Sequence, residues 1–136
     1  MPHQPIEDME FFLLFESVTD RIWELVSNWP RLSQNTLGEQ LVRAADSIGF
    51  NLVEGDGRFS QQDSIKFFVI ARGSARETRL GLRRAVKRQL VDPEEGAALI
   101  VKIESATRLL NLFINYRRSV KFAKENRADY LAVVEE

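Results

Sequence analysis

The sequence predicts an all-α protein, an antiparallel up-down-up-down four-helix bundle that forms a single domain over residues 1–136. Apolar residues recur at helical spacing along four stretches, and no alternating strand pattern bounded by turns competes with them. Short connections join the stretches, which favours antiparallel neighbours. A domain of this length buries roughly two thirds of its unfolded surface, which is enough for a stable core without disulfides or bound metals.

The first helix is predicted over residues 6–28. Its apolar positions are Met9, Phe12, Leu13, Phe15, Ile22, Leu25 and Val26, at a spacing that predicts a buried face. The helix is expected to stop before Trp29 and Pro30, because a residue that precedes proline is driven out of the helical conformation. A short loop is expected to follow.

The second helix is predicted over residues 37–54. Thr36 and Glu39 have the spacing of a capping box, which opens a helix by satisfying its first backbone donors. The apolar line of this helix consists of Leu37, Leu41, Ala44, Ala45, Ile48 and Leu52. Gly55 and Gly57 are expected to end it, because glycine adopts the left-handed conformation of a helix C-terminus at little cost.

The third and fourth helices are predicted over residues 61–90 and 93–126. Ser60 and Asp63 resemble a second capping box, and Asp92 followed by Pro93 gives an N-cap and a first-turn proline. The two apolar lines are Phe68, Ala71, Ala75, Thr78, Leu82, Val86 and Leu90, then Leu99, Ile103, Ala106, Leu110, Phe113 and Val120. Residues 127–136 could dock on a neighbour or fray.

Two glycines lie inside the predicted third helix. Gly73 and Gly81 cost helix stability at interior positions. We therefore expect a neighbouring backbone to pack closely against each of them.

Small and polar side chains occupy positions in the middle of the chain where a bundle ordinarily has leucine. This predicted polar seam consists of Ser47, Asn51, Glu54, Ser74 and Glu77. We expect a hydrogen-bonded network that fixes the register of two helices, with Arg43, Arg58 or Arg72 satisfying the carboxylates. The alternative is a catalytic pair of carboxylates, formed by Glu54 and Glu77, for acid and base chemistry.

Charge is unevenly spread although the formal net charge is only −1. A candidate nucleic-acid-binding surface consists of Arg72, Arg76, Arg79, Arg83, Arg84, Lys87 and Arg88, with Glu77 the single acid among them. Arginine offers bidentate donors to phosphate, which favours RNA or DNA as a partner. Against this, the pI is about 5.9 and no aromatic residues interleave with the bases to stack on nucleobases. The alternative is a solvated face or one paired with another subunit.

Glu16, Asp20 and Glu24 are spaced by four residues and therefore form an acidic ladder along one side of the first predicted helix. The first and third helices of an up-down-up-down bundle are diagonal, so the ladder and the basic residues cannot meet within one protomer. We expect them to pair across a head-to-tail contact between subunits, which is the kind of contact that closes into a ring.

The five apolar residues from Phe11 to Phe15 turn through more than a full helical revolution, so they cannot all face one core. A contiguous apolar patch on a soluble protein usually marks a contact site. This predicts an oligomer interface at Phe11, Phe12, Leu14 and Phe15. The alternative is a wide core contact with one exposed aromatic side chain.

Composition excludes several classes of site. The chain has no cysteine, which removes disulfides, thiolate metal sites and thiol catalysis and is compatible with a cytoplasmic protein. The single histidine, His3, stands alone, whereas a di-metal bundle site usually has Glu-x-x-His pairs. No phosphate-binding glycine loop, serine elbow, zinc motif or calcium loop is present. We therefore expect no enzymatic activity, no cofactor, no metal and no membrane partner.

Residues 40–77 resemble a known bacterial family. The residues that carry the resemblance are Gln40, Leu41, Arg43, Ala44, Ala45, Ser47, Ile48, Asn51, Glu54, Gly55, Arg58, Phe67, Ala71, Arg72, Gly73, Ser74 and Glu77. The pattern is similar to that of the 23S rRNA-intervening sequence proteins, whose relatives include the accessory variability determinant proteins of diversity-generating retroelements. Gly49 and Phe50 depart from it, because the family usually has proline and alanine at these two positions.

The resemblance implies a four-helix fold, commonly assembled as a pentameric ring, with nucleic-acid-associated roles and no established enzymatic activity. It favours a non-enzymatic scaffold that associates with RNA through the basic residues of the third helix. The alternative is a protein-binding adaptor, for example for a reverse transcriptase, with no direct nucleic-acid contact.

Overall fold

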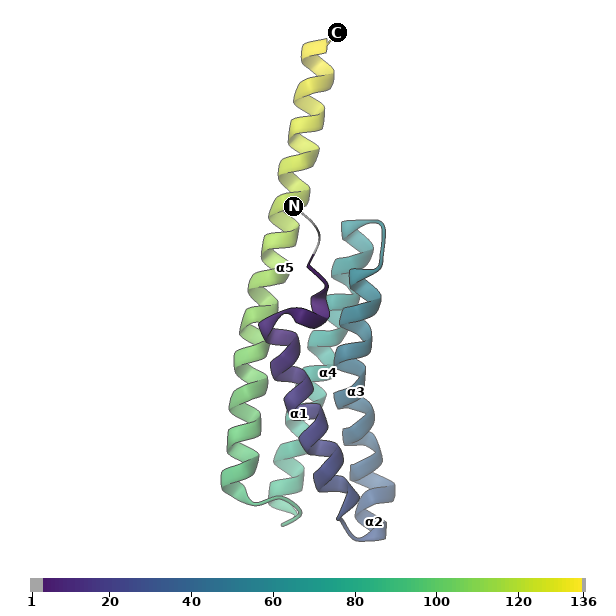
Figure 1. The fold of residues 1–136 in the computed structure, drawn as a ribbon, viewed down its shortest axis with the longest axis vertical. Coiled ribbons are helices and arrows are strands. Elements are labelled where there is room, and N and C mark those ends of the chain that lie inside the picture. The colour runs from purple at the N-terminus through teal and green to yellow at the C-terminus, as the bar shows by residue number, and fades with distance from the viewer. Residues whose placement is uncertain (1–3, 136) are drawn as a thin grey trace.

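A computed structural model of the chain describes residues 4–135, with side chains described over residues 4–120. Four long helices lie alongside one another (Figure 1). They are α1 (Glu10–Ser27), α3 (Glu39–Asp56), α4 (Gln61–Lys87) and α5 (Pro93–Glu135). Three short segments complete the described chain, a 3-10 turn at Ile6–Asp8, α2 at Arg31–Ser33 and a π-helical turn at Gln34–Gly38. The predicted all-helical fold with four long helices is confirmed.

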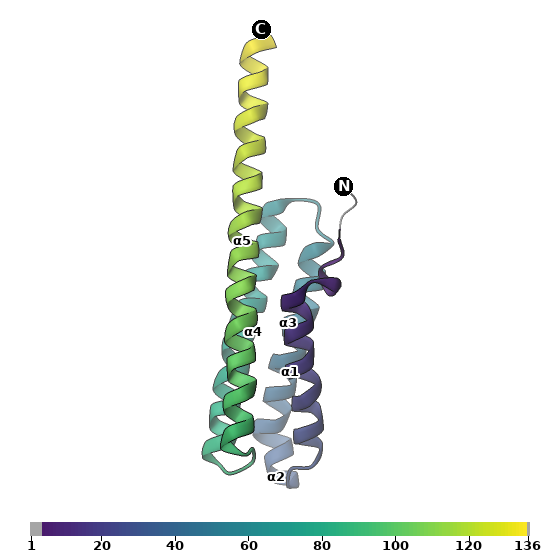
Figure 2. The ribbon, with the colours of Figure 1, turned by 60° about the vertical axis from the view of Figure 1, so that its left-hand side comes forward.

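Each long helix packs mainly against two others, in the order α1, α3, α4, α5 and back to α1. The α3 and α4 pair is joined by a hydrogen bond of 2.9 Å between the hydroxyls of Ser47 and Ser74. The α1 and α5 pair is joined by Arg21, whose Nε and Nη2 donate to Glu95 at 2.6 and 2.8 Å. Figures 1 and 2 show that neighbours in this cycle run in opposite directions.

The core contains the apolar lines that helical periodicity predicts. Its largest fully buried side chains include Phe15, Phe68, Ile48, Leu52, Leu82, Ile103, Leu110 and Ile114. Each such side chain contributes roughly 1.5–3 kcal/mol by leaving water. Phe113 is half-buried and joins α5 to two neighbours, because its ring centroid lies 5.4 Å from those of both Phe11 and Phe68.

The first predicted helix is interrupted near its start. Met9 is extended, with φ −78° and ψ 148°, so the turn at Ile6–Asp8 is separate from α1. The Ile6 backbone N–H donates to Asp56 Oδ2 of α3 at 3.2 Å, and Ile6 is fully buried. The prediction of one continuous helix from residue 6 is therefore wrong, because this segment turns to cover the end of α3.

The capping box predicted at Thr36 is also wrong. Residues 31–56 are helical throughout, and Thr36 lies inside the π-helical turn with its hydroxyl donating to the Leu32 carbonyl at 2.7 Å. The predicted loop is replaced by helix that begins directly after Pro30. Gln34 explains how the two helices join so tightly, because its Nε2 donates to the last carbonyls of α1, those of Val26 and Ser27.

Both of the later helix starts agree with the sequence. The Ser60 hydroxyl accepts from the Asp63 backbone N–H at 3.1 Å, and Asp92 Oδ2 accepts from the backbone of Glu94 at 3.1 Å. Helix α4 ends at Lys87, three residues before the predicted 90, in a turn where Gln89 has a φ of 61°. The Leu90 N–H reaches back to the Ala85 carbonyl at 2.8 Å, which is the pattern of a Schellman motif.

Helix α5 extends well past the predicted residue 126 and projects beyond the other helices (Figures 1 and 2). Whether the side chains of residues 127–136 dock on a neighbour falls outside the described residues.

Candidate functional site

The basic residues of α4 fall into two groups. Arg72 is half-buried and its Nη1 donates to Asn111 Oδ1 of α5 at 2.9 Å. Arg79 Nε lies 3.2 Å from Glu104 Oε1, also on α5. These two arginines therefore bind the neighbouring helix of their own protomer, and are less available to an external partner than the sequence predicts.

The second group is exposed and consists of Arg76, Arg83, Arg84, Lys87 and Arg88. Within the described part of the chain these five side chains form no hydrogen bond or ion pair. Arg84 and Lys87 occupy the last turn of α4 and Arg88 is its C-cap, where the negative end of the helix dipole favours cations. This end of α4 is the strongest candidate for contact with phosphate.

Farther up α4, Arg76 and Arg83 border a surface hollow of about 350 Å³. The hollow is also lined by Glu77, Arg79 and Leu80, and Leu80 is 49% exposed. Gly73 lies one turn away, and a Cβ built there would have no neighbour within 4 Å. Among the residues that the structure describes, the close neighbour expected at Gly73 is thus missing. At Gly81 a close neighbour is present, but it is the side chain of Leu41 rather than a backbone, since a Cβ would lie 2.7 Å from Leu41 Cδ1.

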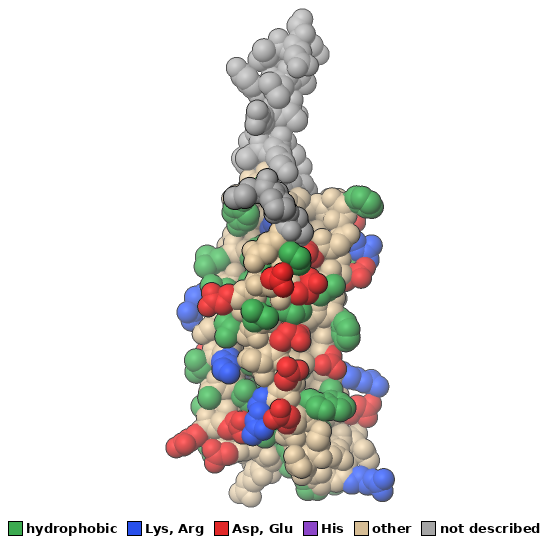
Figure 3. All heavy atoms as spheres, in the orientation of Figure 1, with side chains coloured by type: hydrophobic (Ala, Val, Ile, Leu, Met, Phe, Trp, Pro, Cys, Tyr) green, Lys and Arg blue, Asp and Glu red, His purple; other side chains and the backbone are tan. Residues whose placement is uncertain are grey.

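The acidic ladder of α1 borders a second hollow, of about 350 Å³, between α1 and α3. Glu16 and Asp20 line it from α1, and Asp46, Phe50 and Val53 line it from α3. Figure 3 shows acidic side chains gathered along this face of the molecule. Glu24, the last member of the ladder, is paired instead with Arg21 at 2.9 Å.

Glu16 is the least exposed of the three acids in this hollow. Burial raises the pKa of Glu16 above its ordinary value, and the nearby charges of Asp20 and Asp46 raise it further. Gly49 makes room for this side chain, because a Cβ at residue 49 would lie 2.8 Å from Glu16 Oε1. The hollow would therefore gain from a cation that neutralises its acids.

Phe50 is a surface residue that the sequence analysis did not place in any site. Its side chain is 74% exposed on the outer side of α3, beside the acidic hollow. The signal was present in the sequence, since Gly49 and Phe50 are the two positions that depart from the family pattern.

Part of the predicted polar seam is formed. The Ser47 hydroxyl hydrogen-bonds to Ser74, and Asn51 Nδ2 donates to the Ser47 carbonyl and hydroxyl at 2.8 and 2.9 Å. Glu54 pairs at 2.5 Å with Arg58, which is one of the three arginines expected to satisfy the seam carboxylates. Among the described residues, it makes no hydrogen bond to Ser47, Asn51 or Ser74.

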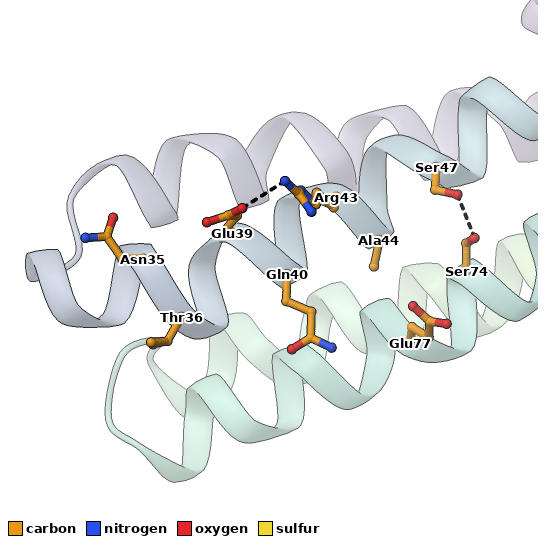
Figure 4. Close-up of a pocket in the computed structure, with 9 residues that line it drawn as sticks. All are labelled: Asn35, Thr36, Glu39, Gln40, Arg43, Ala44, Ser47, Ser74 and Glu77. Carbon is orange, nitrogen blue, oxygen red and sulfur yellow. Dashed lines mark hydrogen bonds and ion pairs between the residues drawn. The ribbon is translucent and has the colours of Figure 1, made fainter.

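A groove of about 690 Å³ runs beside this seam between α3 and α4 (Figure 4). Its lining residues are Asn35, Thr36, Glu39, Gln40, Arg43, Ala44, Ser47, Ser74 and Glu77. Glu77 lies opposite Ala44, ten residues from Glu54 along α3, so about 15 Å separates the two carboxylates that the catalytic alternative would require. Arg43 pairs with Glu39 at 2.9 Å.

The interface predicted from the Phe11 to Phe15 run is wrong for its three aromatic residues. Phe11, Phe12 and Phe15 are at most 8% exposed inside the protomer. Helix α1 buries a wide face because it packs against both α3 and α5. Leu14 is half-buried, and the exposed member of the run is Leu13, at 56%.

Two further properties concern membranes and metals. Over the described residues, the helices lack any segment long and apolar enough to cross a membrane. The same part of the chain contains no group of three or more His, Cys, Asp or Glu residues placed to hold a metal ion.

Known proteins with similar sequences and folds place these surfaces in context. The family model for the 23S rRNA-intervening sequence protein matches residues 7–112. The fold is similar to the crystal structure of a protein of unknown function from the S23 ribosomal protein family of Bacteroides thetaiotaomicron, with a TM-score of 0.66 and 23% sequence identity. That match covers 74% of this chain and 94% of the other. Among curated proteins, none matches the chain.

Proposed function

The chain belongs to the 23S rRNA-intervening sequence protein family, and from that premise we propose that it is a non-enzymatic scaffold that assembles into a homo-oligomeric ring and associates with RNA. Each protomer is an up-down-up-down bundle, and five copies form the ring that the family resemblance implies. The protein acts in the cytoplasm and uses no cofactor.

The observation that supports the RNA proposal is the cluster of cations at the C-terminal end of α4, formed by Arg84, Lys87 and the C-cap Arg88, which have no ion pair in the described part of the chain. Like charges one turn apart on a helix repel by a few tenths of a kcal/mol, so Arg84 and Arg88 gain from an anionic partner. Phosphate suits them because arginine can donate two parallel hydrogen bonds to it.

A ring would multiply this small surface. Every copy places the same end of α4 on the same rim, so one RNA strand can meet several clusters at once. Binding at one cluster then raises the effective concentration of phosphates at the next, which converts weak single contacts into useful affinity. This suits a protein whose overall charge is only −1.

A second candidate function is a protein-binding adaptor, for example for a reverse transcriptase. It is favoured by exposed apolar side chains on α5, where Val101, Leu112 and Tyr116 are 59%, 61% and 65% exposed. Apolar surface of this kind suits a protein partner better than a phosphate backbone.

The test is filter binding of single-stranded RNA across a salt series. The triple variant Arg84→Gln, Lys87→Gln, Arg88→Gln should weaken binding and flatten the salt dependence, by about one unit of slope for each phosphate that the variant no longer binds. The matched control is Arg72→Gln with Arg79→Gln, which removes two cations already bound to α5 and should change binding much less.

RNA association is refuted if the wild-type protein binds no RNA at about 50 mM salt, where phosphate contacts are strongest. In that case, recovery of a protein partner after nuclease treatment, abolished by Leu112→Asp, would support the adaptor.

A further inference from the structure

Two surfaces on opposite parts of the bundle complement each other in shape and charge. One is the acidic hollow between α1 and α3, where Phe50 stands out beside Glu16, Asp20 and Asp46. We call it the knob face. The other is the outer side of α4 around Gly73, bordered by Ile70, Arg76, Glu77 and Leu80, which we call the notch face.

The notch face lacks a partner within the described part of the protomer. An interior glycine weakens a helix, and Gly73 gains no packing in return, because a Cβ there would meet open space. Ile70 and Leu80 on either side are 45% and 49% exposed, so an apolar surface surrounds a position with no side chain. Arg76 stands next to it without an ion pair in the described part of the chain.

The knob face has the opposite properties. Phe50 is an aromatic side chain that is 74% exposed, and the acids around it lack cations within the hollow. An aromatic anchor surrounded by a charged rim is the usual composition of the centre of a protein interface. Beside the notch, Arg76 and Arg83 are cations and Glu77 is the acid among them, so the surface around the notch has an excess of positive charge that suits this rim.

The two faces lie at the same height along the bundle. The Thr19 hydroxyl of α1 donates to the Ala45 carbonyl of α3 at 3.3 Å, so these two residues are level. Ser47 of α3 is level with Ser74 of α4 through their 2.9 Å hydrogen bond. Ala45 lies two residues before Ser47 on α3, and Arg76 lies two residues after Ser74 on α4. Because α3 and α4 run in opposite directions (Figure 1), Ala45 is level with Arg76, and so is Thr19.

Counting residues along each helix in the same way gives the position of the other residues of the two faces along the bundle axis. Asp20 and Asp46 are within about two residues of the level of Arg76, and Phe50 and Glu16 are within about two residues of the level of Gly73. Two residues of helix correspond to about 3 Å. Copies of the chain can therefore stand side by side, knob face to notch face, without sliding along the bundle axis.

We propose that Phe50 of one copy packs on the Gly73 notch of the next, with Asp20 and Asp46 facing Arg76, and that this contact closes the ring. The contact is heterologous, since it joins two different surfaces. Repetition by rotation alone gives a closed ring, whereas an axial shift would give an open filament. The inference rests on the proposed self-association and assigns its interface. It leaves the Arg84, Lys87 and Arg88 end of α4 free for RNA.

Sedimentation velocity at micromolar concentration tests the interface. Phe50→Ala removes the knob, and Gly73→Leu fills the notch with a residue that favours helix. Each should raise the dissociation constant about tenfold or more, as expected for the centre of an interface. Leu112→Ala is the matched control, because it removes an equally exposed apolar side chain from α5. Circular dichroism checks that each variant is folded.

A mixing experiment makes the test independent of any single variant. Phe50→Ala copies retain a notch, and Gly73→Leu copies retain a knob, so the mixture can form one intact contact and should contain heterodimers. Each variant alone should remain monomeric. Heterodimers that form only on mixing also show that both variants are folded and that the contact is head-to-tail.

The outcomes separate the two levels of the proposal. A monomeric wild-type protein overturns the ring itself. An assembled wild-type protein whose Phe50→Ala and Gly73→Leu variants assemble equally well overturns this interface and leaves the ring standing. Folded variants that are monomeric both alone and when mixed also overturn the knob-to-notch contact.

Discussion

At the scale of single residues, Gly55 sets how closely α3 and α4 approach. A Cβ at this position would lie 2.9 Å from the Ser64 carbonyl oxygen and 2.9 Å from Phe67 Cβ. Both atoms are on or next to the backbone of α4, so they cannot move aside as a flexible side chain could. Gly57 lies two residues further on, where a Cβ would meet only ordinary contacts of 3.8 Å.

We therefore predict that Gly55→Ala lowers the free energy of unfolding by about 1–3 kcal/mol, the usual cost of overpacking. Gly57→Ala is the matched control and should change it by no more than about 0.5 kcal/mol, because Gly57 has a φ of −84° that alanine readily adopts. Urea unfolding followed by circular dichroism measures both. Equal effects of the two substitutions would show that the helices do not approach at Gly55 as described.

At the scale of helices, two positions with the same sequence signal behave differently. Ser60 follows an extended approach and its hydroxyl accepts from the Asp63 N–H, so it is a true N-cap. Thr36 has the same spacing to an acid but already lies in helix, where its hydroxyl donates backwards to Leu32. A capping residue stabilises a helix only where the chain enters from a non-helical conformation.

Accordingly, Ser60→Ala should lower the free energy of unfolding by about 1 kcal/mol, whereas Thr36→Ala should change it by a few tenths. Thermal and urea unfolding of the two variants provide the comparison. A larger decrease for Thr36→Ala than for Ser60→Ala would mean that α3 begins at residue 37, as the sequence pattern alone suggests.

The four helices and most of the core were predictable because helical periodicity is a local property of the chain. Three features were not predictable, and each depends on contacts between distant residues. The burial of Phe11, Phe12 and Phe15 requires α1 to pack against two helices at once. The capture of Arg72 and Arg79 by α5 depends on the rotation of α4. The equal height of the knob face and the notch face along the bundle depends on the register of α1, α3 and α4.

At the scale of the whole molecule, opposite charges occupy different sides of one protomer. The hollow between α1 and α3 is lined by three carboxylates, Glu16, Asp20 and Asp46, and by no cation. Burial and the charges of Asp20 and Asp46 raise the pKa of Glu16 above its ordinary value of 4.5. In an isolated protomer, Glu16 therefore takes up a proton at a higher pH than an ordinary glutamate does. In the proposed ring, Arg76 of the next copy enters the same hollow, and its charge would favour the charged form of Glu16 and lower the pKa of this group.

The ring should therefore dissociate as the solution is acidified. The isolated protomer binds the Glu16 proton more tightly than the ring does, so the stability that Glu16 gives to the ring is fully present above the protomer's pKa and is lost as pH falls from there through the lower pKa that Glu16 has in the ring. Sedimentation velocity from neutral pH down to about 4.5 measures the change. Glu16→Gln removes the titrating group and should make assembly less dependent on pH, while Glu24→Gln, whose carboxylate already pairs with Arg21, should retain the wild-type dependence. If wild-type protein and Glu16→Gln dissociate in parallel over this range, Glu16 does not face the cations of a neighbouring copy.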